Sequence, residues 1–301
     1  MYPPRFHYEA PHSLEEALQL LSEYEGEAKV LSGGMSLIPM MKLRFASPEV
    51  ILDVNNIAGL DYLEEGQGVL RVGALVRNRD IIKSELIRSR YPLFASAAPQ
   101  ISDPLVRGRG TPVGSLCHAD PQGDWGAVFL AMNGEVVARS RSGERRIPMG
   151  KFFRGPFQNT MNPDELAVEA RVPVPQGTPF GVYHKLERKI GDFATVGVGV
   201  YLDLSGSSIT TAGIGLTGVG PGNIKAEAAE QALVSGGLSE RTIEEAARLA
   251  AEAARPSTDH RGSEEYKRHM VKVYTMRALQ AAAGQEPFDV HRRKYEKSAV
   301  F

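Results

Sequence analysis

Two glycine-containing segments in the first half of the chain carry residue types that can bind a phosphate group. In the first, Leu31-Ser-Gly-Gly-Met-Ser-Leu37, a predicted strand runs into a glycine turn and then into a helix. Glycines let the backbone approach an anion closely, and the exposed N–H groups of such a turn can donate to it. A hydrogen bond to a charged group contributes about 1.5–3 kcal/mol, so three or four donors could hold a pyrophosphate. A plain tight turn is the alternative, and the Gly-Gly pair alone favours it.

The second segment runs from Arg107-Gly-Arg-Gly-Thr-Pro-Val-Gly-Ser115 to Asp124. We expect an open loop rich in Gly and Arg, followed by a helix at 125–132. Glycines with a Thr and a Ser before a helix are typical of an anion-binding helix start. The Asp124 carboxylate can accept a hydrogen bond from a ribose or ribityl hydroxyl, although a surface loop explains the same composition equally well. His118 and Asp120 lack the spaced partners of a metal site, so no metal ligands are predicted.

A third segment, Tyr183 to Ala194, could contact a flat ring system. Strand alternation places Lys185 on one face, and Gly191-Asp-Phe193 predicts a turn that presents an aromatic ring. A flat, electron-rich ring system needs an aliphatic or aromatic cover and a cation or donor at its pyrimidine edge. Arg188 and Lys189 are predicted to be solvated surface charges.

A further glycine pattern, Gly213-Ile-Gly-Leu-Thr-Gly218, matches the dinucleotide-binding sequence G-x-G-x-x-G. That motif requires a strand that ends at its first glycine and a helix that begins by its third. Here the apolar alternation continues through Val219, and Gly220 and Pro221 follow. The segment is therefore predicted to be a strand and not a Rossmann site.

The elements that must position these segments divide the chain into three parts and a tail. Residues 1–56 form a small α/β unit. Residues 57–176 form a second, in which residues 80–90 are predicted to be a single helix. Pro173-Val-Pro-Gln-Gly177 is typical of a linker. Residues 177–284 combine a three-stranded antiparallel meander with helices, of which the first is predicted at 224–234. Residues 285–301 are expected to be a loosely held tail.

The composition excludes several classes of protein. The chain has 301 residues, 42% of them hydrophobic, and a formal net charge of −1, so it is typical of globular proteins and shows no basic surface for nucleic acid. No stretch approaches the roughly 20 apolar residues of a transmembrane helix, and no signal peptide is evident, so a cytoplasmic location is expected. The single cysteine, Cys117, excludes an internal disulfide and a self-contained four-ligand Fe–S cluster.

Taken in order, these segments resemble the FAD-binding subunits of molybdenum hydroxylases, which belong to the vanillyl-alcohol-oxidase/PCMH flavoprotein superfamily. The run from Ser32 to Arg44 resembles the first flavin loop of that family, and the run from Arg107 to Pro121 resembles the second. The further motifs that match in order and spacing are Phe152-Phe-Arg-Gly155, Pro163-Asp-Glu-Leu166, Arg188 to Ala194 and Arg261-Gly-Ser-Glu-Glu-Tyr266. The resemblance covers residues 1–283.

The resemblance implies an α+β fold, in which a PCMH-type FAD-binding domain of two α/β subdomains precedes a C-terminal domain that covers the flavin ring. It implies that both glycine loops bind the FAD pyrophosphate and that Asp124 lies on the ribose or ribityl side. It further implies that Lys185, Asp192 and Phe193 attend the isoalloxazine, and that no residue is catalytic toward the reducing substrate. The implied cofactor-binding residues are Leu31, Ser32, Gly33, Gly34, Met35, Ser36, Leu37, Thr111, Pro112, Val113, Gly114, Ser115, Asp124, Lys185, Asp192 and Phe193.

The same resemblance implies partner subunits. Electrons would leave a molybdenum cofactor on a large subunit, pass two [2Fe–2S] clusters on an iron–sulfur small subunit, and reach FAD on this chain. The implied acceptor is a quinone, NAD or oxygen. The expected assembly is a dimer of such heterotrimers, and any membrane association would be made through the partners.

Two details concern the substrate and the tightness of FAD binding. Leu37-Ile-Pro-Met-Met-Lys42 and the Lys185 segment most resemble members that oxidise carbon monoxide, which is therefore the expected substrate, although aromatic and purine hydroxylases share the same flavin subunit. The family usually has Thr-Ile-Gly-Gly-Ser in the second loop and a polar residue at the position of Met35. Pro112 lacks an N–H, and we expect Val113 to place a side chain where a glycine would allow the closest approach to FAD. A stand-alone flavin oxidase and a flavin-free interaction subunit are the alternative functions.

Overall fold

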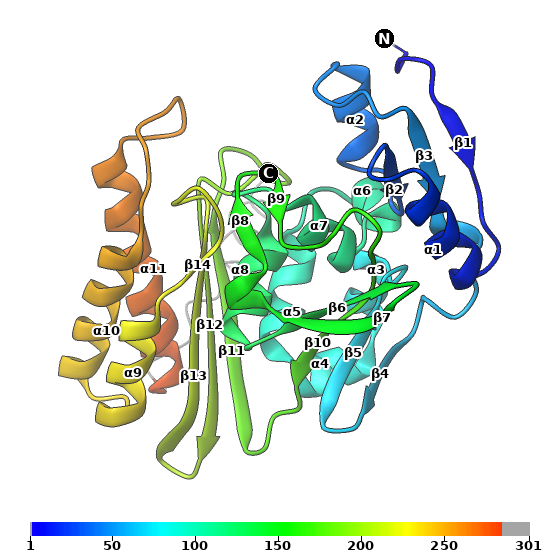
Figure 1. Cartoon of the computed structure of the whole chain (residues 1–301). Helices are drawn as coiled ribbons and strands as arrows, with labels where there is room; N and C mark the ends of the chain where they lie inside the picture. The colour runs from blue at the N-terminus through cyan, green and yellow to red at the C-terminus, as the bar shows by residue number, and fades with distance from the viewer. Residues whose placement is uncertain (1, 285–301) are drawn as a thin grey trace, which may run out of the picture.

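A computed structural model describes residues 2–284, and the predicted tail at 285–301 lies outside the described residues. Three units follow one another across the molecule, each with its own hydrophobic core (Figure 1). The fold is α+β, as the resemblance implied. Within residues 2–284, no helix is long and apolar enough to cross a membrane, and no group of three His, Cys, Asp or Glu residues could hold a metal ion.

The N-terminal unit is a parallel sheet with a helix packed on it. Its strands lie in the order β1 (His7–Glu9), β3 (Val50–Asp53), β2 (Ala28–Leu31). Helix α1 (Leu14–Glu23) is capped by Ser13, whose side chain accepts from the N–H of Glu16, while the Glu16 carboxylate accepts from the N–H of His12. The short helix α2 (Leu37–Lys42) follows β2 after the glycine turn.

The central unit is an antiparallel sheet with helices on one face. The strand order is β4 (Leu63–Gly66), β5 (Val69–Gly73), β10 (Leu166–Pro173), β6 (Glu135–Ser140), β7 (Gly143–Pro148). Its core is built around Phe94, Trp125 and Phe129, whose ring centroids lie 5.2–6.1 Å apart. A separate hairpin joins β8 (Phe153–Gly155) and β9 (Gln158–Asn159).

Two local predictions about this unit are wrong. The helix predicted at 80–90 is two helices, α3 (Asn78–Lys83) and α4 (Glu85–Arg90), because Ser84 is extended and caps the second one. The segment expected to be an open loop forms α6 (Pro104–Arg109) and α7 (Pro112–His118), each with a proline in its first turn, where the missing N–H has no helical partner to lose. The other elements are α5 (Pro92–Ala97), α8 (Asp124–Ala131) and the 3₁₀ turns η1 (Val54–Asn56), η2 (Ala98–Gln100) and η3 (Met149–Lys151).

The C-terminal unit contains the predicted meander of β11 (Thr178–Leu186), β12 (Val196–Ser205) and β13 (Ser208–Thr217). A two-residue strand, β14 (Ile224–Lys225), extends the sheet and occupies the start of the helix predicted at 224. Helices α9 (Glu227–Gly236), α10 (Glu240–Ala253) and α11 (Glu264–Ala282) lie on the outer side, while α8 of the central unit packs against β12 and β13 (Figure 1).

Residues 213–217 of the glycine pattern are part of strand β13, as predicted, and Gly218 follows the strand. A Cβ at Gly213 or Gly215 would lie less than 3.0 Å from the carbonyl oxygen of Ala131 or Ala127 in α8. These two glycines therefore let the backbone of α8 rest directly on the C-terminal sheet.

Candidate functional site

The structure brings the two predicted phosphate-binding segments into direct contact. We call residues 31–37 the first loop and residues 107–115 the second loop. An added Cβ at Gly33 would lie less than 3.0 Å from the backbone oxygen of Arg109 and 2.8 Å from Cα of Gly110. The hydroxyls of Ser32 and Thr111 lie 3.4 Å apart. Only a glycine at position 33 allows the two backbones to approach this closely.

The first loop supplies a run of backbone donors. The carbonyl oxygens of Gly34 and Ser36 accept hydrogen bonds from Ile38 and Met40, because the loop leads into the first turn of α2. Within residues 2–284, the structure shows no acceptor for the backbone N–H groups of residues 33–36. Gly34 has a φ of 72°, a conformation that favours glycine. The donor set suits the oxygens of a phosphate group.

The second loop ends in the first turn of α7. The Thr111 hydroxyl caps this helix by accepting from the N–H of Gly114 at 3.0 Å. A Cβ at Gly114 would lie 2.6 Å from that hydroxyl, so glycine is needed for the cap. Pro112 occupies the first helical position, and Val113, which is 2% exposed, is part of the central hydrophobic core. The expectation that the Val113 side chain faces the ligand side is therefore wrong.

A polar chain that the sequence did not indicate ties the two loops together. The Arg77 guanidinium donates to the Arg109 backbone oxygen at 2.7 Å and to the Asn55 side chain. Asn55 in turn donates to the backbone oxygen of Ser32 at 2.8 Å. Burial and the neighbouring charge of Arg109 lower the pKa of Arg77. An anion bound beside these two guanidinium groups would offset their mutual repulsion.

Asp124 and Lys185, which were expected at different parts of a cofactor, form a buried pair. Asp124, 8% exposed, begins helix α8 and accepts from the Lys185 ammonium at 3.0 Å and from the Tyr183 hydroxyl at 2.6 Å. Lys185 also donates to the backbone oxygen of Gln100 at 3.1 Å. Burial raises the pKa of Asp124, and the Lys185 charge and the Tyr183 hydrogen bond oppose that rise.

The turn after β11 presents an aromatic ring, as predicted. Phe193 is half exposed, and the backbone beside it is fixed by Arg261, which donates to the Phe193 oxygen at 2.9 Å and pairs with Asp192 at 3.2 Å. Burial would raise the pKa of Asp192, but the Phe193 N–H, Arg188 and Arg261 together lower it to about 2. Arg188, predicted to be solvated, is about half exposed and also pairs with Asp192.

The predicted turn also lies close to the second loop. A Cβ at Gly191, which has a φ of 85°, would lie 3.1 Å from the Ser102 backbone, just before α6. Ser115 reaches towards the start of α8, since its hydroxyl would lie 3.6 Å from a Cβ at Gly123. The first loop therefore contacts the second loop, and the Phe193 turn contacts the residues just before α6, while Val113 and the Asp124–Lys185 pair are buried.

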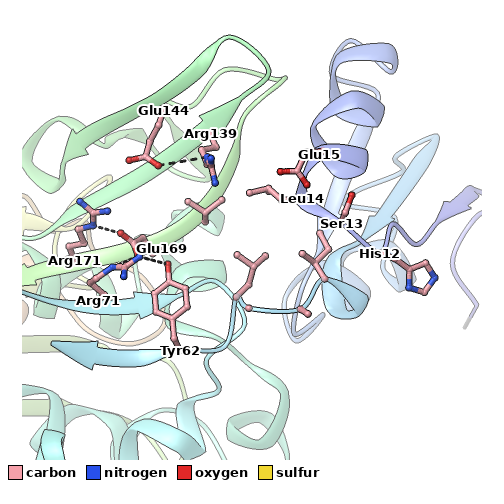
Figure 2. A pocket seen from close by; sticks show the side chains of 15 residues that line it. His12, Ser13, Leu14, Glu15, Tyr62, Arg71, Arg139, Glu144, Glu169 and Arg171 are labelled. Atoms are coloured by element: carbon pink, nitrogen blue, oxygen red, sulfur yellow. Dashed lines mark hydrogen bonds and ion pairs between the residues drawn. The ribbon is translucent and has the colours of Figure 1, made fainter. Parts of the chain in front are cut away.

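A polar cavity of about 400 Å³ lies between the start of α1 and the other face of the central sheet (Figure 2). In it Glu169, 1% exposed, accepts hydrogen bonds from Tyr62, Arg71 and Arg171. Burial would raise the pKa of Glu169, but these donors outweigh burial and hold the pKa below its usual range. None of the predicted cofactor-binding residues lines this cavity.

Comparisons with known proteins support one family. A model of the FAD binding domain in molybdopterin dehydrogenase matches residues 4–175, and a model of the CO dehydrogenase flavoprotein C-terminal domain matches residues 181–282. The chain is 39% identical to the carbon monoxide dehydrogenase medium chain of Hydrogenophaga pseudoflava, over 94% of this chain and 98% of that protein. It is 37% identical to the glyceraldehyde dehydrogenase medium chain of Sulfolobus acidocaldarius, over 94% of this chain and 100% of that protein.

A solved structure gives the same result. Carbon monoxide dehydrogenase from Hydrogenophaga pseudoflava, in a form that lacks the Mo-pyranopterin moiety of the molybdenum cofactor, superposes with a TM-score of 0.91 and 40% identity. The match covers 95% of this chain and 99% of that one.

Proposed function

Because the chain belongs to the family of FAD-binding medium subunits of molybdenum hydroxylases, we propose that it carries electrons through FAD within a heteromeric oxidoreductase. The observation that carries this proposal is the contact between the first and second loops, which gathers backbone donors and the Arg77 and Arg109 charges in one place. Such an arrangement suits a pyrophosphate, whose two phosphates need both donors and positive charge.

Among the described residues, the unpaired backbone N–H groups of residues 33–36 and the half-exposed Phe193 ring support a placement of FAD between them. We assign the pyrophosphate to residues 33–36 and the first turn of α7, and the isoalloxazine to the region between the Asp124–Lys185 pair and Phe193. Phe193 would cover one face of the ring, while Lys185 would present an N–H at its polar edge. FAD accepts and releases electrons when bound, and the residues around it position it and set the charge near it.

The substrate and the partner subunits of the complex are further proposals. We propose that the complex is a carbon monoxide dehydrogenase, supported by 39% identity to the medium chain with that name. The similar identity of 37% to a glyceraldehyde dehydrogenase medium chain supports a small aldehyde as the second candidate. An iron–sulfur small subunit and a molybdenum-containing large subunit would complete the heterotrimer, with a quinone, NAD or oxygen as the acceptor.

An anaerobic reduction experiment tests the subunit role. The isolated, FAD-loaded chain should be bleached by dithionite but not by carbon monoxide or glyceraldehyde, because the four cluster ligands of an Fe–S centre cannot come from one cysteine. Addition of the purified partner subunits with one substrate should restore bleaching and identify that substrate. Bleaching by a substrate without partners would instead support a stand-alone oxidase, and a purified chain that binds no FAD would support a flavin-free interaction subunit.

A further inference from the structure

Tyr183 lies in the C-terminal sheet, but its polar atoms form hydrogen bonds to residues of the central unit. The side chain is 1% exposed, and its hydroxyl donates to Asp124 at 2.6 Å. The Tyr183 N–H donates to the Ser96 hydroxyl at 2.9 Å, and its carbonyl oxygen accepts from the Gln100 side chain at 2.8 Å. The residue is therefore fixed to the central unit at three points, two on its backbone and one at the ring hydroxyl.

Two glycines in β12 make the slot that holds this ring. Gly199 lies opposite Tyr183 in the sheet and Gly197 lies opposite Lys185. A Cβ at Gly197 would lie less than 3.0 Å from the Tyr183 hydroxyl oxygen, and a Cβ at Gly199 would lie 3.5 Å from the ring. Because β12 has no side chain at these two positions, it leaves the space that the ring and hydroxyl of Tyr183 occupy beside Asp124.

The Asp124 carboxylate, which accepts this hydrogen bond, is also held in place by its surroundings. The single hydroxyl proton of Thr217 in β13 is shared between the backbone oxygens of Pro121 and Gly123, each 3.0 Å away and just before Asp124. Asp124 then has one donor on each oxygen, Tyr183 on Oδ1 and Lys185 on Oδ2. An ammonium has three N–H groups, and Lys185 uses two of them for Asp124 and the Gln100 oxygen.

We propose that Tyr183 is a positioning residue of the flavin site. Its hydroxyl keeps Asp124 ionised and oriented, which holds the Lys185 ammonium in place and sets the charge at the ring edge, and hence the redox potential of the flavin. This inference rests on the proposed function, because it needs the isoalloxazine to lie beside the Asp124–Lys185 pair.

The sign of the effect follows from the charges around Asp124. Burial disfavours its ionised form, Asp120 acts in the same direction, and Lys185 and Tyr183 oppose both. Glu187, 3.9 Å from Lys185, adds a further negative charge nearby. Loss of the Tyr183 hydroxyl should raise the proton affinity of Asp124 roughly tenfold or more, the equilibrium equivalent of one hydrogen bond to a charged group. Asp124 then takes up its proton at higher pH, the Lys185 charge is left uncompensated, and the flavin potential rises.

The test compares the full-length, FAD-loaded chain with Tyr183→Phe and with the control Tyr201→Phe, a buried tyrosine of β12 in the same core. The flavin midpoint potential is measured against pH, with the FAD dissociation constant and the melting temperature alongside. We expect Tyr183→Phe to bind FAD within a few-fold of wild type and to shift the break in the potential profile up by about one pH unit. The Tyr201→Phe profile should match wild type.

A profile for Tyr183→Phe that coincides with wild type would overturn the inference. If Tyr183→Phe does not fold, Asp124→Asn decides, because a break that persists without the carboxylate also overturns it. The double variant Tyr183→Phe/Asp124→Asn should match Asp124→Asn alone, since Tyr183 acts through Asp124. A wild-type chain that binds no FAD would overturn the proposed function together with this inference, whereas normal FAD binding with an unmoved profile overturns the inference alone.

Discussion

Substitution of Gly33 by alanine tests whether contact between the two loops creates the FAD site. The new Cβ would lie less than 3.0 Å from the Arg109 oxygen and 2.8 Å from Gly110 Cα, both backbone atoms that cannot rotate away. One loop must therefore move by several tenths of an ångström. Overpacking of this kind costs roughly 1–3 kcal/mol of stability, and the same displacement misaligns the donors at residues 33–36.

The magnitude for FAD follows from the number of donors displaced. Loss of one hydrogen bond to a phosphate removes about 1.5–3 kcal/mol, which corresponds to an increase of roughly tenfold to a hundredfold in the dissociation constant. Gly108→Ala is the matched control, because this glycine lies in α6 of the same second loop and an added Cβ there meets no atom within 4 Å. It should leave FAD affinity unchanged and, as a helical Gly→Ala change, should not destabilise the fold.

The measurement is a titration of each apo-protein with FAD, followed by flavin fluorescence or calorimetry, with a melting curve to establish that each variant is folded. A folded Gly33→Ala protein that binds FAD as tightly as Gly108→Ala would refute the reasoning. In that case the two loops could separate without loss of the donors, and the close approach at Gly33 would serve packing alone.

Three further predictions concern other parts of the site and its support. Phe193→Ala should shift the flavin absorption spectrum and speed reaction of the reduced flavin with oxygen, with a stability change within about 0.5 kcal/mol because the ring is half exposed; an unchanged spectrum and oxidation rate would make Phe193 a turn residue only. Val113→Gly should destabilise the protein by about 2–4 kcal/mol, since it removes a core side chain and adds a helical glycine, and should not tighten FAD binding; tighter binding in a titration would contradict the buried orientation. The Glu169 network should make stability depend on acid pH: the pKa of Glu169 is lowered in the folded state, so its contribution is present above the unfolded pKa of about 4.3 and is lost as pH falls through the folded value. Melting temperatures below pH 5 should therefore fall less steeply for Glu169→Gln than for wild type, and equal slopes would remove Glu169 from the acid response.

The sequence revealed the loops and the meander because their signals are local. A strand that enters a Gly-Gly turn before a helix, or an apolar alternation over ten residues, depends on neighbours in the chain. The strand prediction for the glycine pattern that begins at Gly213 is confirmed for the same reason. The composition of the second loop was misleading, because its glycines and arginines predicted an open loop, whereas prolines stand in the first turns of α6 and α7.

The contacts that could not be predicted join residues far apart in the chain. Asp124 and Lys185 are 61 positions apart, and Arg77 reaches Asn55 and Arg109 from a third segment. The sequence does not show that Val113 faces the core, because its orientation depends on the first turn of α7, and this segment was expected to be a loop. The pairing of Asp124 also changes its chemistry, from an acceptor open to a ribityl hydroxyl to one that already has a donor on each oxygen.

The glycines of β13 show why domain packing and the site are connected. A nucleotide motif needs its glycines beside a ligand, whereas Gly213 and Gly215 lie beneath the carbonyl oxygens of Ala131 and Ala127. Because α8 rests on these glycines, its first residue, Asp124, is brought against Lys185 of β11. A side chain at either glycine would lift α8 from the sheet and separate that pair. The glycines that resemble a nucleotide-binding motif therefore do not contact the proposed flavin site themselves. They fix the position of helix α8, whose first residue lies in that site.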